Sequence, residues 1–319
     1  MLRKYRIKKV LSLIILLTIF SATFVHAEEI QEDRNYNIIR KSYITGEVTT
    51  ETFYPNAARS SRPIVPAYNP SGIDTTVSNE NGIDALSASG RYYVKPNKFP
   101  YTAIGQLEGD YKGPNGSVVS SFTCSASIKG PDILFSAAHC AYDSSLGGWS
   151  DTLEFYPARD GNSKPYHATV GEISIAQSYA DEGKDDWSIM FVDKDLGDLG
   201  WFGLGEASSA LVNKSLKTSG YDGDKNGQQW EAVGTVKRIG DYYGEDNVIM
   251  DLSGLDDVKG GHSGGPIFDN DGIIWSNYTF CGGAYSGGGR AVDSWLYDIL
   301  QDEYYKSIKR YSRYSNLYS

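Results

Sequence analysis

The sequence predicts an all-β protein, a sandwich or a barrel, that ends in one α-helix. From about Arg91 onward, short apolar runs are separated by Gly, Asp and Asn, which is typical of many short strands joined by turns. Helical periodicity occurs once, near the end of the chain, where one face carries Val292, Trp295, Leu296, Ile299 and Leu300. The roughly 230 residues after Arg91 are within the size of a single all-β domain.

Residues 1–27 have the features of a secretory signal peptide. A start with five basic side chains precedes an apolar run over residues 10–25, and Val25-His26-Ala27 supplies small residues for cleavage. A membrane anchor is the alternative, but the run is shorter than the about 20 residues that a span needs. We therefore expect a secreted, extracellular protein that has no membrane attachment once the signal is removed.

Residues 28–90 differ from the rest of the chain in composition and in hydrophobic patterning. They contain turn-forming stretches such as Asn69-Pro70-Ser71-Gly72, and their apolar periodicity is weak. We interpret them as a pro-segment or linker rather than a domain, with the mature protein beginning near residues 89–93. Residues 91–319 then form the folded domain.

Eight strands are expected within this domain. They cover residues 121–128, 133–136, 152–156, 187–192, 215–221, 230–239, 248–251 and 273–277. The C-terminal helix is expected at about residues 291–310.

The net charge argues against a nucleic-acid partner. The whole chain carries −10, and loss of a signal with five basic and no acidic side chains leaves the exported chain near −15. We interpret this charge as an aid to solubility, and we expect a monomer.

A glycine-rich heptapeptide, Gly260-Gly261-His262-Ser263-Gly264-Gly265-Pro266, indicates a catalytic serine. Glycine lets the backbone turn sharply and lets a substrate carbonyl approach main-chain N–H groups. A serine hydroxyl is a weak nucleophile, so it needs a base within hydrogen-bond reach and a third group that orients the base.

Among the four histidines, His139 is the best candidate for that base. It follows an apolar run, Ile133-Leu134-Phe135, and two small alanines that leave space around it, and Cys140 is the next residue. His26 leaves with the signal, His262 should point away from its neighbour Ser263, and His167 is expected to be a surface or strand residue. Asp186, at the start of an apolar run, is the candidate orienting acid, with Asp185 one residue further out.

The order of these residues separates two hydrolase folds. Gly261-His262-Ser263-Gly264-Gly265 also fits the Gly-x-Ser-x-Gly elbow of α/β-hydrolases, whose acid and histidine follow the serine. No histidine follows Ser263, so that fold is excluded. The order His139, Asp186, Ser263 is the order found in chymotrypsin-like proteases.

At these motifs the chain resembles the chymotrypsin-fold serine endopeptidases. The matching stretches are Ser136-Ala137-Ala138-His139-Cys140, Asp186-Trp187-Ser188-Ile189 and Gly261-His262-Ser263-Gly264-Gly265-Pro266. Phe99-Pro100-Tyr101-Thr102-Ala103-Ile104 and Ser219-Gly220-Tyr221-Asp222-Gly223-Asp224-Lys225 are similar to the secreted bacterial branch that includes glutamyl endopeptidases.

The resemblance implies an architecture and a mechanism. It implies two six-stranded Greek-key β-barrels, at about 96–200 and 201–290, and a disulfide between Cys124 and Cys140, which the spacing of three cysteines leaves open. It further implies a zymogen whose mature form hydrolyses polypeptide substrates through an acyl-enzyme on Ser263. The N–H groups of Gly261 and Ser263 form the implied oxyanion hole.

Two departures from the family pattern affect activation and specificity. His262 stands where animal digestive enzymes have an aspartate that pairs with the new N-terminus, so we expect no such switch here. Glutamyl endopeptidases carry a histidine on the strand after the nucleophile, a place that falls near Asn277 and Tyr278 in this chain. Asp257, six residues before Ser263, is either an acid at the base of the P1 pocket or, as we prefer, a solvated loop carboxylate.

Neither a cofactor nor a metal is expected. The sequence has no His-Glu-x-x-His motif and no cysteine cluster. The alternative from another class of protein is a catalytically inactive secreted binding protein on the same fold, because a fold does not by itself establish an activity.

Overall fold

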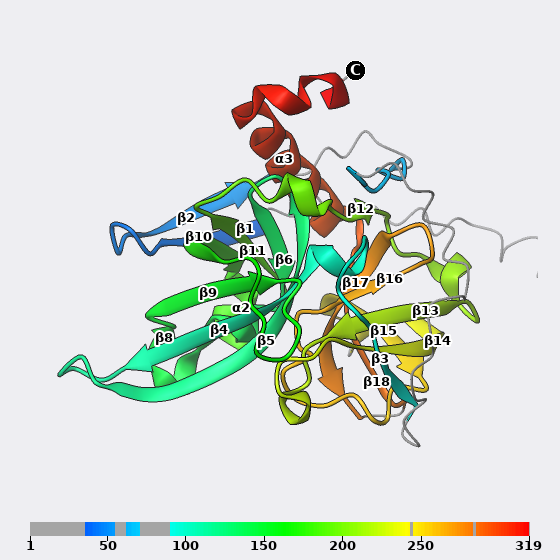
Figure 1. Ribbon diagram of the computed structural model, residues 1–319, viewed down its shortest axis with the longest axis horizontal. Helices are drawn as coiled ribbons and strands as arrows, with labels where there is room; N and C mark the ends of the chain where they lie inside the picture. Colours follow the sequence, from blue (N-terminus) through cyan, green and yellow to red (C-terminus); the bar gives the residue numbers. More distant parts are fainter. Residues whose placement is uncertain (1–35, 55–61, 71–89, 243–244, 283–284, 319) are drawn as a thin grey trace, which may run out of the picture. The chain divides into compact units, whose positions relative to one another are not determined.

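The computed structural model describes residues 36–54, 62–70, 90–242, 245–282 and 285–318. The predicted signal peptide, residues 1–27, lies outside these ranges. Two closed antiparallel β-barrels carry the described part of the chain, and one long helix follows them (Figure 1). None of the helices in the described ranges is long and apolar enough to span a bilayer.

The first barrel has six strands, which pair in the order β11-β6-β5-β4-β9-β10 and close through a further pairing of β10 with β11. Its strands are β4 (Ile104–Lys112), β5 (Val118–Gly130), β6 (Ile133–Ser136), β9 (Thr152–Pro157), β10 (Ala168–Ala176) and β11 (Ser188–Val192).

The second barrel repeats this arrangement. Its strands pair in the order β17-β16-β13-β14-β15-β18, and β17 also pairs with β18. They are β13 (Ser215–Gly220), β14 (Trp230–Tyr242), β15 (Glu245–Ser253), β16 (Pro266–Phe268), β17 (Ile273–Cys281) and β18 (Gly287–Ala291). The expected pair of six-stranded barrels is thus confirmed.

Shorter elements lie at the edges of the two barrels. The short strands are β3 (Arg91–Tyr93) on β14, β12 (Gly203–Leu204) on β17, and the pair β7 (Tyr142–Asp143) and β8 (Gly148–Trp149). Helix α2 (Gln177–Glu182) follows β10, and the 3-10 turns are Tyr101–Ala103, Ala138–Cys140, Ser144–Leu146, Gly197–Leu199, Ser209–Leu211, Gly223–Lys225 and Ser312–Tyr318.

All eight expected strands are present, but four barrel strands were not expected: β4, β10, β16 and β18. Strand β18 reads Gly-Gly-Gly-Arg-Ala and has no apolar alternation. Its glycines are needed because a Cβ at Gly289 would lie 1.5 Å from the carbonyl oxygen of Asn277, and one at Gly288 would lie 2.1 Å from that of Met250. Glycine is required in this strand because neighbouring backbones approach it closely, so the strand has no side-chain pattern by which it could be predicted.

Helix α3 (Ser294–Arg310) confirms the predicted C-terminal helix. The Asp293 side chain caps it by accepting a hydrogen bond from the Leu296 N–H. Its apolar residues Leu296, Ile299 and Leu300 are buried in the same core cluster as the first barrel.

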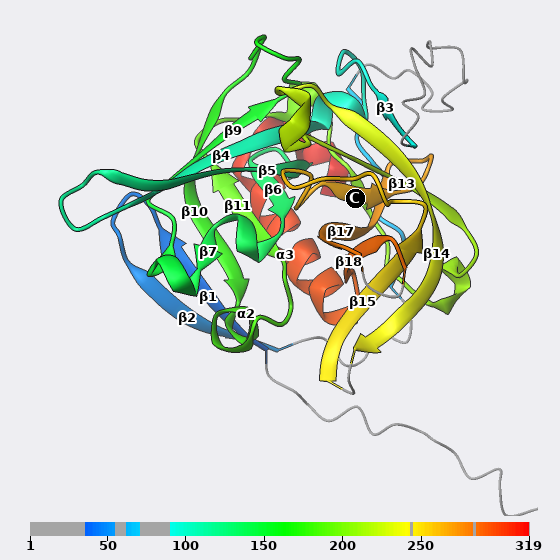
Figure 2. The same ribbon diagram turned by 90° about the horizontal axis from the view of Figure 1, so that it is seen from below.

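Part of the predicted pro-segment is ordered β-structure. Strands β1 (Tyr36–Ser42) and β2 (Val48–Phe53) form an antiparallel pair that extends the first barrel's sheet at β10. Figure 2 shows β1 next to β10, with β2 on the outer side of β1. The weak apolar periodicity of this region did not predict them, because β2 is almost entirely exposed and contributes no buried face.

Candidate active site

Asp186 holds His139 through two hydrogen bonds. The backbone N–H of His139 donates to Asp186 Oδ1 at 3.0 Å, and His139 Nδ1 lies 2.7 Å from Asp186 Oδ2. An ionised carboxylate only accepts hydrogen bonds, so it selects the tautomer with the proton on Nδ1 and leaves Nε2 free to act as a base. The His139 side chain is 32% exposed, which keeps the ring accessible.

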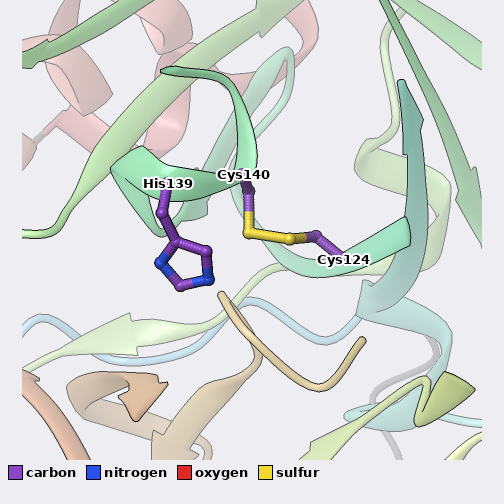
Figure 3. Close-up of side chains that lie close together, drawn as sticks. All are labelled: Cys124, His139 and Cys140. Carbon is purple, nitrogen blue, oxygen red and sulfur yellow. A yellow bond between two sulfur atoms is a disulfide. The ribbon is translucent and has the colours of Figure 1, made fainter. Parts of the chain in front are cut away.

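A disulfide packs against this histidine. Cys124 and Cys140 are joined, as the resemblance implies, with an S–S distance of 2.04 Å. Figure 3 shows the His139 ring beside the bond, on the short turn that also carries Cys140. The link fixes the His139 segment to strand β5.

Ser263 is attached to the same strand. Its carbonyl oxygen accepts a hydrogen bond from the N–H of Ser125 at 2.7 Å and lies 3.5 Å from Cys140 Sγ. Cys124 and Ser125 are consecutive residues of β5. One dipeptide of the first barrel therefore anchors both the His139 segment, through the disulfide, and the backbone of Ser263, through a hydrogen bond.

Two glycines allow the Ser263 loop to take this position. Gly264 has φ +82°, and a Cβ there would lie 2.0 Å from Ser136 Oγ. Gly261 has φ +98°, and a Cβ there would lie 2.5 Å from the Tyr221 carbonyl oxygen. These left-handed conformations and close approaches require glycine at both positions. The Ser125 hydroxyl donates to the Gly261 carbonyl at 2.8 Å, which further fixes the loop.

The N–H groups of Gly261 and Ser263 are available for a ligand. Within the described ranges, neither group donates a hydrogen bond to another part of the chain. Two unpaired backbone N–H groups flanking one residue, beside a nucleophile, can stabilise an oxyanion.

His262 points away from Ser263, as the sequence predicts. It is fully buried, with Nε2 3.0 Å from Thr218 Oγ1 and Nδ1 3.5 Å from Asp222 Oδ1. Burial alone raises the pKa of the Asp222 carboxyl, but His262, the Lys259 N–H and Arg91 outweigh it and hold that pKa below its usual value. These buried contacts hold the Ser263 loop in place. The sequence did not indicate this role for Asp222, because its partners His262 and Lys259 lie about 40 positions away in the chain.

Asn277 links the second barrel to both sides of the His139–Asp186 pair. It is completely buried, and its Nδ2 donates to the carbonyl oxygens of Ser136 at 2.8 Å and Asp186 at 3.1 Å. From the sequence, Asn277 is expected to take part in substrate binding. In the structure its amide donors are used inside the protein.

The other two residues expected near the substrate lie in different settings. Tyr278 is 2% exposed, and its backbone pairs with Gly264 and Gly265 beside the serine. Asp257 is half-buried, and its carboxylate lies 3.5 Å from the place that a Cβ of Gly90 would take.

Asp185 has a structural partner that the sequence did not indicate. It is buried, with φ +58°, and its Oδ1 accepts from Arg290 Nε at 2.7 Å. Arg290 is 2% exposed and also reaches Asp293 Oδ2 at 2.7 Å. Asp185 thus holds the turn that presents Asp186 and does not itself face His139. The remaining candidate base, His167, is exposed and pairs with Glu154 at 2.6 Å.

One cluster in the described ranges has the spacing of a metal site, but its chemistry does not fit. Ligand atoms of Cys124, His139 and Cys140 lie within 4.8 Å of one another. Cysteine binds metal as a thiolate. Both sulfurs are bonded to each other here, so neither is available as a ligand.

The pair of six-stranded antiparallel barrels is the fold of a trypsin-like protein. A family model described as Trypsin matches residues 89–297, and the chain belongs to this family.

The chain is similar to two bacterial proteins. A glutamyl endopeptidase of Bacillus licheniformis is 30% identical over 192 residues, which cover 59% of this chain and 54% of that protein. An extracellular metalloprotease of Bacillus subtilis is 30% identical over 178 residues, 54% of this chain and 53% of the relative. The chain thus spans about half the length of the curated relatives it matches.

Among solved structures, a Glu endopeptidase in complex with MPD superposes with a TM-score of 0.58 at 21% identity. The match covers 68% of this chain and 97% of that one. At this identity the similarity supports the fold.

Proposed function

We propose that this protein is a secreted serine endopeptidase that hydrolyses polypeptides through His139, Asp186 and Ser263. The observation that carries the proposal is the pair of hydrogen bonds that Asp186 accepts from His139, next to a serine held on the same β5 dipeptide as the histidine segment. Secretion is supported by the basic and apolar character of residues 1–27.

The reaction proceeds in two steps through an acyl-enzyme. Ser263 Oγ attacks the peptide carbonyl carbon while His139 Nε2 takes its proton. The protonated ring then gives this proton to the leaving amine, the C–N bond breaks, and an ester to Ser263 remains. In the second step, a water molecule attacks the ester carbonyl carbon while His139 Nε2 takes its proton. The bond to Ser263 Oγ then breaks, His139 returns the proton to Oγ, and the carboxylic acid is released.

The other residues stabilise charge as it develops. Asp186 keeps His139 in the required tautomer and stabilises the imidazolium. The N–H groups of Gly261 and Ser263 bind the oxyanion of each tetrahedral intermediate, and loss of one such donor typically costs about 2.7–4 kcal/mol of barrier.

A preference for glutamate at the cleavage site, which the name glutamyl endopeptidase implies for the relative, is not expected for this chain. Strand β17 after the nucleophile carries Asn277 and Tyr278 and has no histidine to meet an acidic side chain.

Replacing Ser263 by alanine tests the nucleophile. We expect Ser263→Ala in the processed protein to lower kcat on casein by about a million-fold, because the acyl-enzyme cannot form. The matched control is Ser208→Ala, since Ser208 is an exposed serine outside the site.

A serine-directed fluorophosphonate separates the endopeptidase from the inactive binding protein. The wild type and Ser208→Ala should be labelled, and Ser263→Ala should not. Casein cleavage by Ser263→Ala at the wild-type rate, or no label on the processed wild type, would reject the proposal.

The pH dependence of activity should report His139. Burial lowers its pKa, but the charge of Asp186 and the hydrogen bond to it raise the pKa to a net value above the usual one. Because the base must be neutral, kcat/KM should rise with pH through this raised pKa, with a midpoint above about 6.5.

The control for this profile is His167→Gln, which removes the exposed histidine and should leave the midpoint unchanged. A midpoint at or below the ordinary histidine value would contradict an ionised Asp186 beside the base.

A further inference from the structure

The residues before the trypsin-family match form a docked segment. We define the N-terminal segment as residues 36–54 and 62–70, all of which precede residue 89, where the match begins. From its sequence, this segment is expected to belong to a pro-segment, a part of the chain that is normally discarded after cleavage.

The backbone of β1 completes one edge of the first barrel. Strand β9 pairs with only Ala168 and Thr169 of β10, and β1 pairs with the rest of that side, from Glu172 to Ala176. Without β1, these N–H and C=O groups would form an open strand edge.

Apolar side chains of the segment belong to the core of the first barrel. Ile38 is 4% exposed and Ile39 is 9% exposed, and both are members of its core cluster. Burial of each such side chain is worth about 1.5–3 kcal/mol. The Tyr68 ring stacks on Trp201 at a centroid distance of 4.0 Å, and their backbones exchange hydrogen bonds of 2.9 and 3.0 Å.

Two arginines tie the segment to helix α3. Arg62 binds Asp298 in a bidentate pair of 2.8 and 2.7 Å, with exposed fractions of 8% and 10% for the two side chains. Arg40 bridges Glu172 of β10 at 2.6 Å and Glu303 of α3 at 2.9 Å. Bidentate, partly buried pairs of this kind are stronger than exposed ones.

The N-terminal segment also lies near Asp185, Arg290 and Asp293, the residues that hold the turn before Asp186. The Tyr36 ring packs on Trp295 at 5.5 Å, and burial raises the pKa of the Tyr36 hydroxyl, on which the charges of Arg290, Asp185 and Asp293 also act. Within the described ranges, hydrogen bonds of the N-terminal segment reach β10, helix α3, Ser150 and residues 201–204. These contacts brace the first barrel.

We infer that the N-terminal segment stays bound to the protease domain after the chain is cut ahead of Arg91, so that the mature protein is a noncovalent pair of chains. The surface formed by the β10 edge and α3 is the binding site, and the pro-segment is its occupant. The inference rests on the proposed maturation of the endopeptidase but not on its catalytic residues.

The test uses the full chain with Ser263→Ala, which prevents self-digestion. A tobacco etch virus protease site is inserted between Gly82 and Ile83, the protein is cut to completion, and the products are separated by size exclusion. We expect the two fragments to elute together in native buffer and apart in denaturant. Separate elution in native buffer would overturn the inference.

Two variants and a control locate the contacts. Ile38→Asp places a charge in the core and Arg62→Met removes the pair with Asp298; each should speed release of the fragment at least about tenfold. Val48→Asp, at a β2 position that is 51% exposed, should release it at the wild-type rate. Release equally slow in all variants would also refute the inference.

Thermal unfolding of each uncut variant checks that it is folded before cleavage. If Ile38→Asp does not fold, Arg62→Met still tests the inference. The same cut chain with Ser263 intact is then treated with fluorophosphonate. Retention without labelling would count against the proposed function and leave this inference standing.

Discussion

Replacing Asp186 by asparagine should lower kcat by about ten thousand-fold while the protein stays folded. Asp186 accepts hydrogen bonds from both the backbone N–H and Nδ1 of His139. The asparagine amide can donate to Nδ1 instead, which selects the tautomer with the proton on Nε2. The base is then already protonated where it must accept the proton of Ser263.

The kinetics of this variant are compared with those of Asp181→Asn, which neutralises an exposed carboxylate on α2 only a few residues away. That control should retain wild-type kcat. If Asp186→Asn retains more than a tenth of the activity, Asp186 does not orient the base. Fluorophosphonate labelling should slow in parallel with kcat, since it needs the same activated serine.

Replacing Arg290 by methionine should lower the free energy of unfolding by about 3–5 kcal/mol, because it leaves buried carboxylates without their cation. Arg290 is fully surrounded and binds Asp185 and Asp293 at 2.7 Å each. Asp185 holds the turn before Asp186, and Asp293 caps α3, so both structures lose their anchor.

Urea denaturation of the Ser263→Ala protein measures this loss without self-digestion. The matched control is Arg313→Met: Arg313 pairs with Asp195 and Asp198, but its side chain is 45% exposed, and it should cost no more than about 1 kcal/mol. Adding Asp185→Asn to Arg290→Met should recover part of the stability by removing one uncompensated charge. A loss below that of Arg313→Met would show that the pair is not a buried anchor.

If the N-terminal segment is retained, its docking should affect both the activity that depends on Asp186 and the stability that depends on Arg290. The Tyr36 ring packs on Trp295 of α3, and the charges of Arg290, Asp185 and Asp293 act on its buried hydroxyl, so we expect release of the segment to increase the exposure of this ionic cluster. Variants that weaken docking should therefore also weaken the support of the His139–Asp186 pair.

The strands that could be predicted are those whose burial alternates or is continuous along the chain. β6 and β11 are almost wholly buried apolar runs, and the sequence located both. β18 and β4 could not be found in this way. Glycines at their contact points, such as Gly289 and Gly105, are required by a neighbouring backbone or ring that the local sequence does not reveal.

For the site, motif order identified the candidates His139, Asp186 and Ser263, since the chemistry needs these residue types and the fold needs them in this order. It did not assign the supporting residues. Asn277, Ser125 and Arg290 act through contacts with residues between 91 and 141 positions away, and no local pattern encodes a partner at such a separation.

By itself, the sequence determined that the chain is all-β with a C-terminal helix, and it identified Ser263 as the candidate nucleophile from motif order. Periodicity and motif spacing are local properties, so they can be read along the chain. Only the tertiary structure decided that Asn277 binds inside the protein, that Asp185 pairs with Arg290, and that β1 completes the β10 edge. These contacts depend on which distant groups meet in the folded core, where most buried polar groups are hydrogen-bonded.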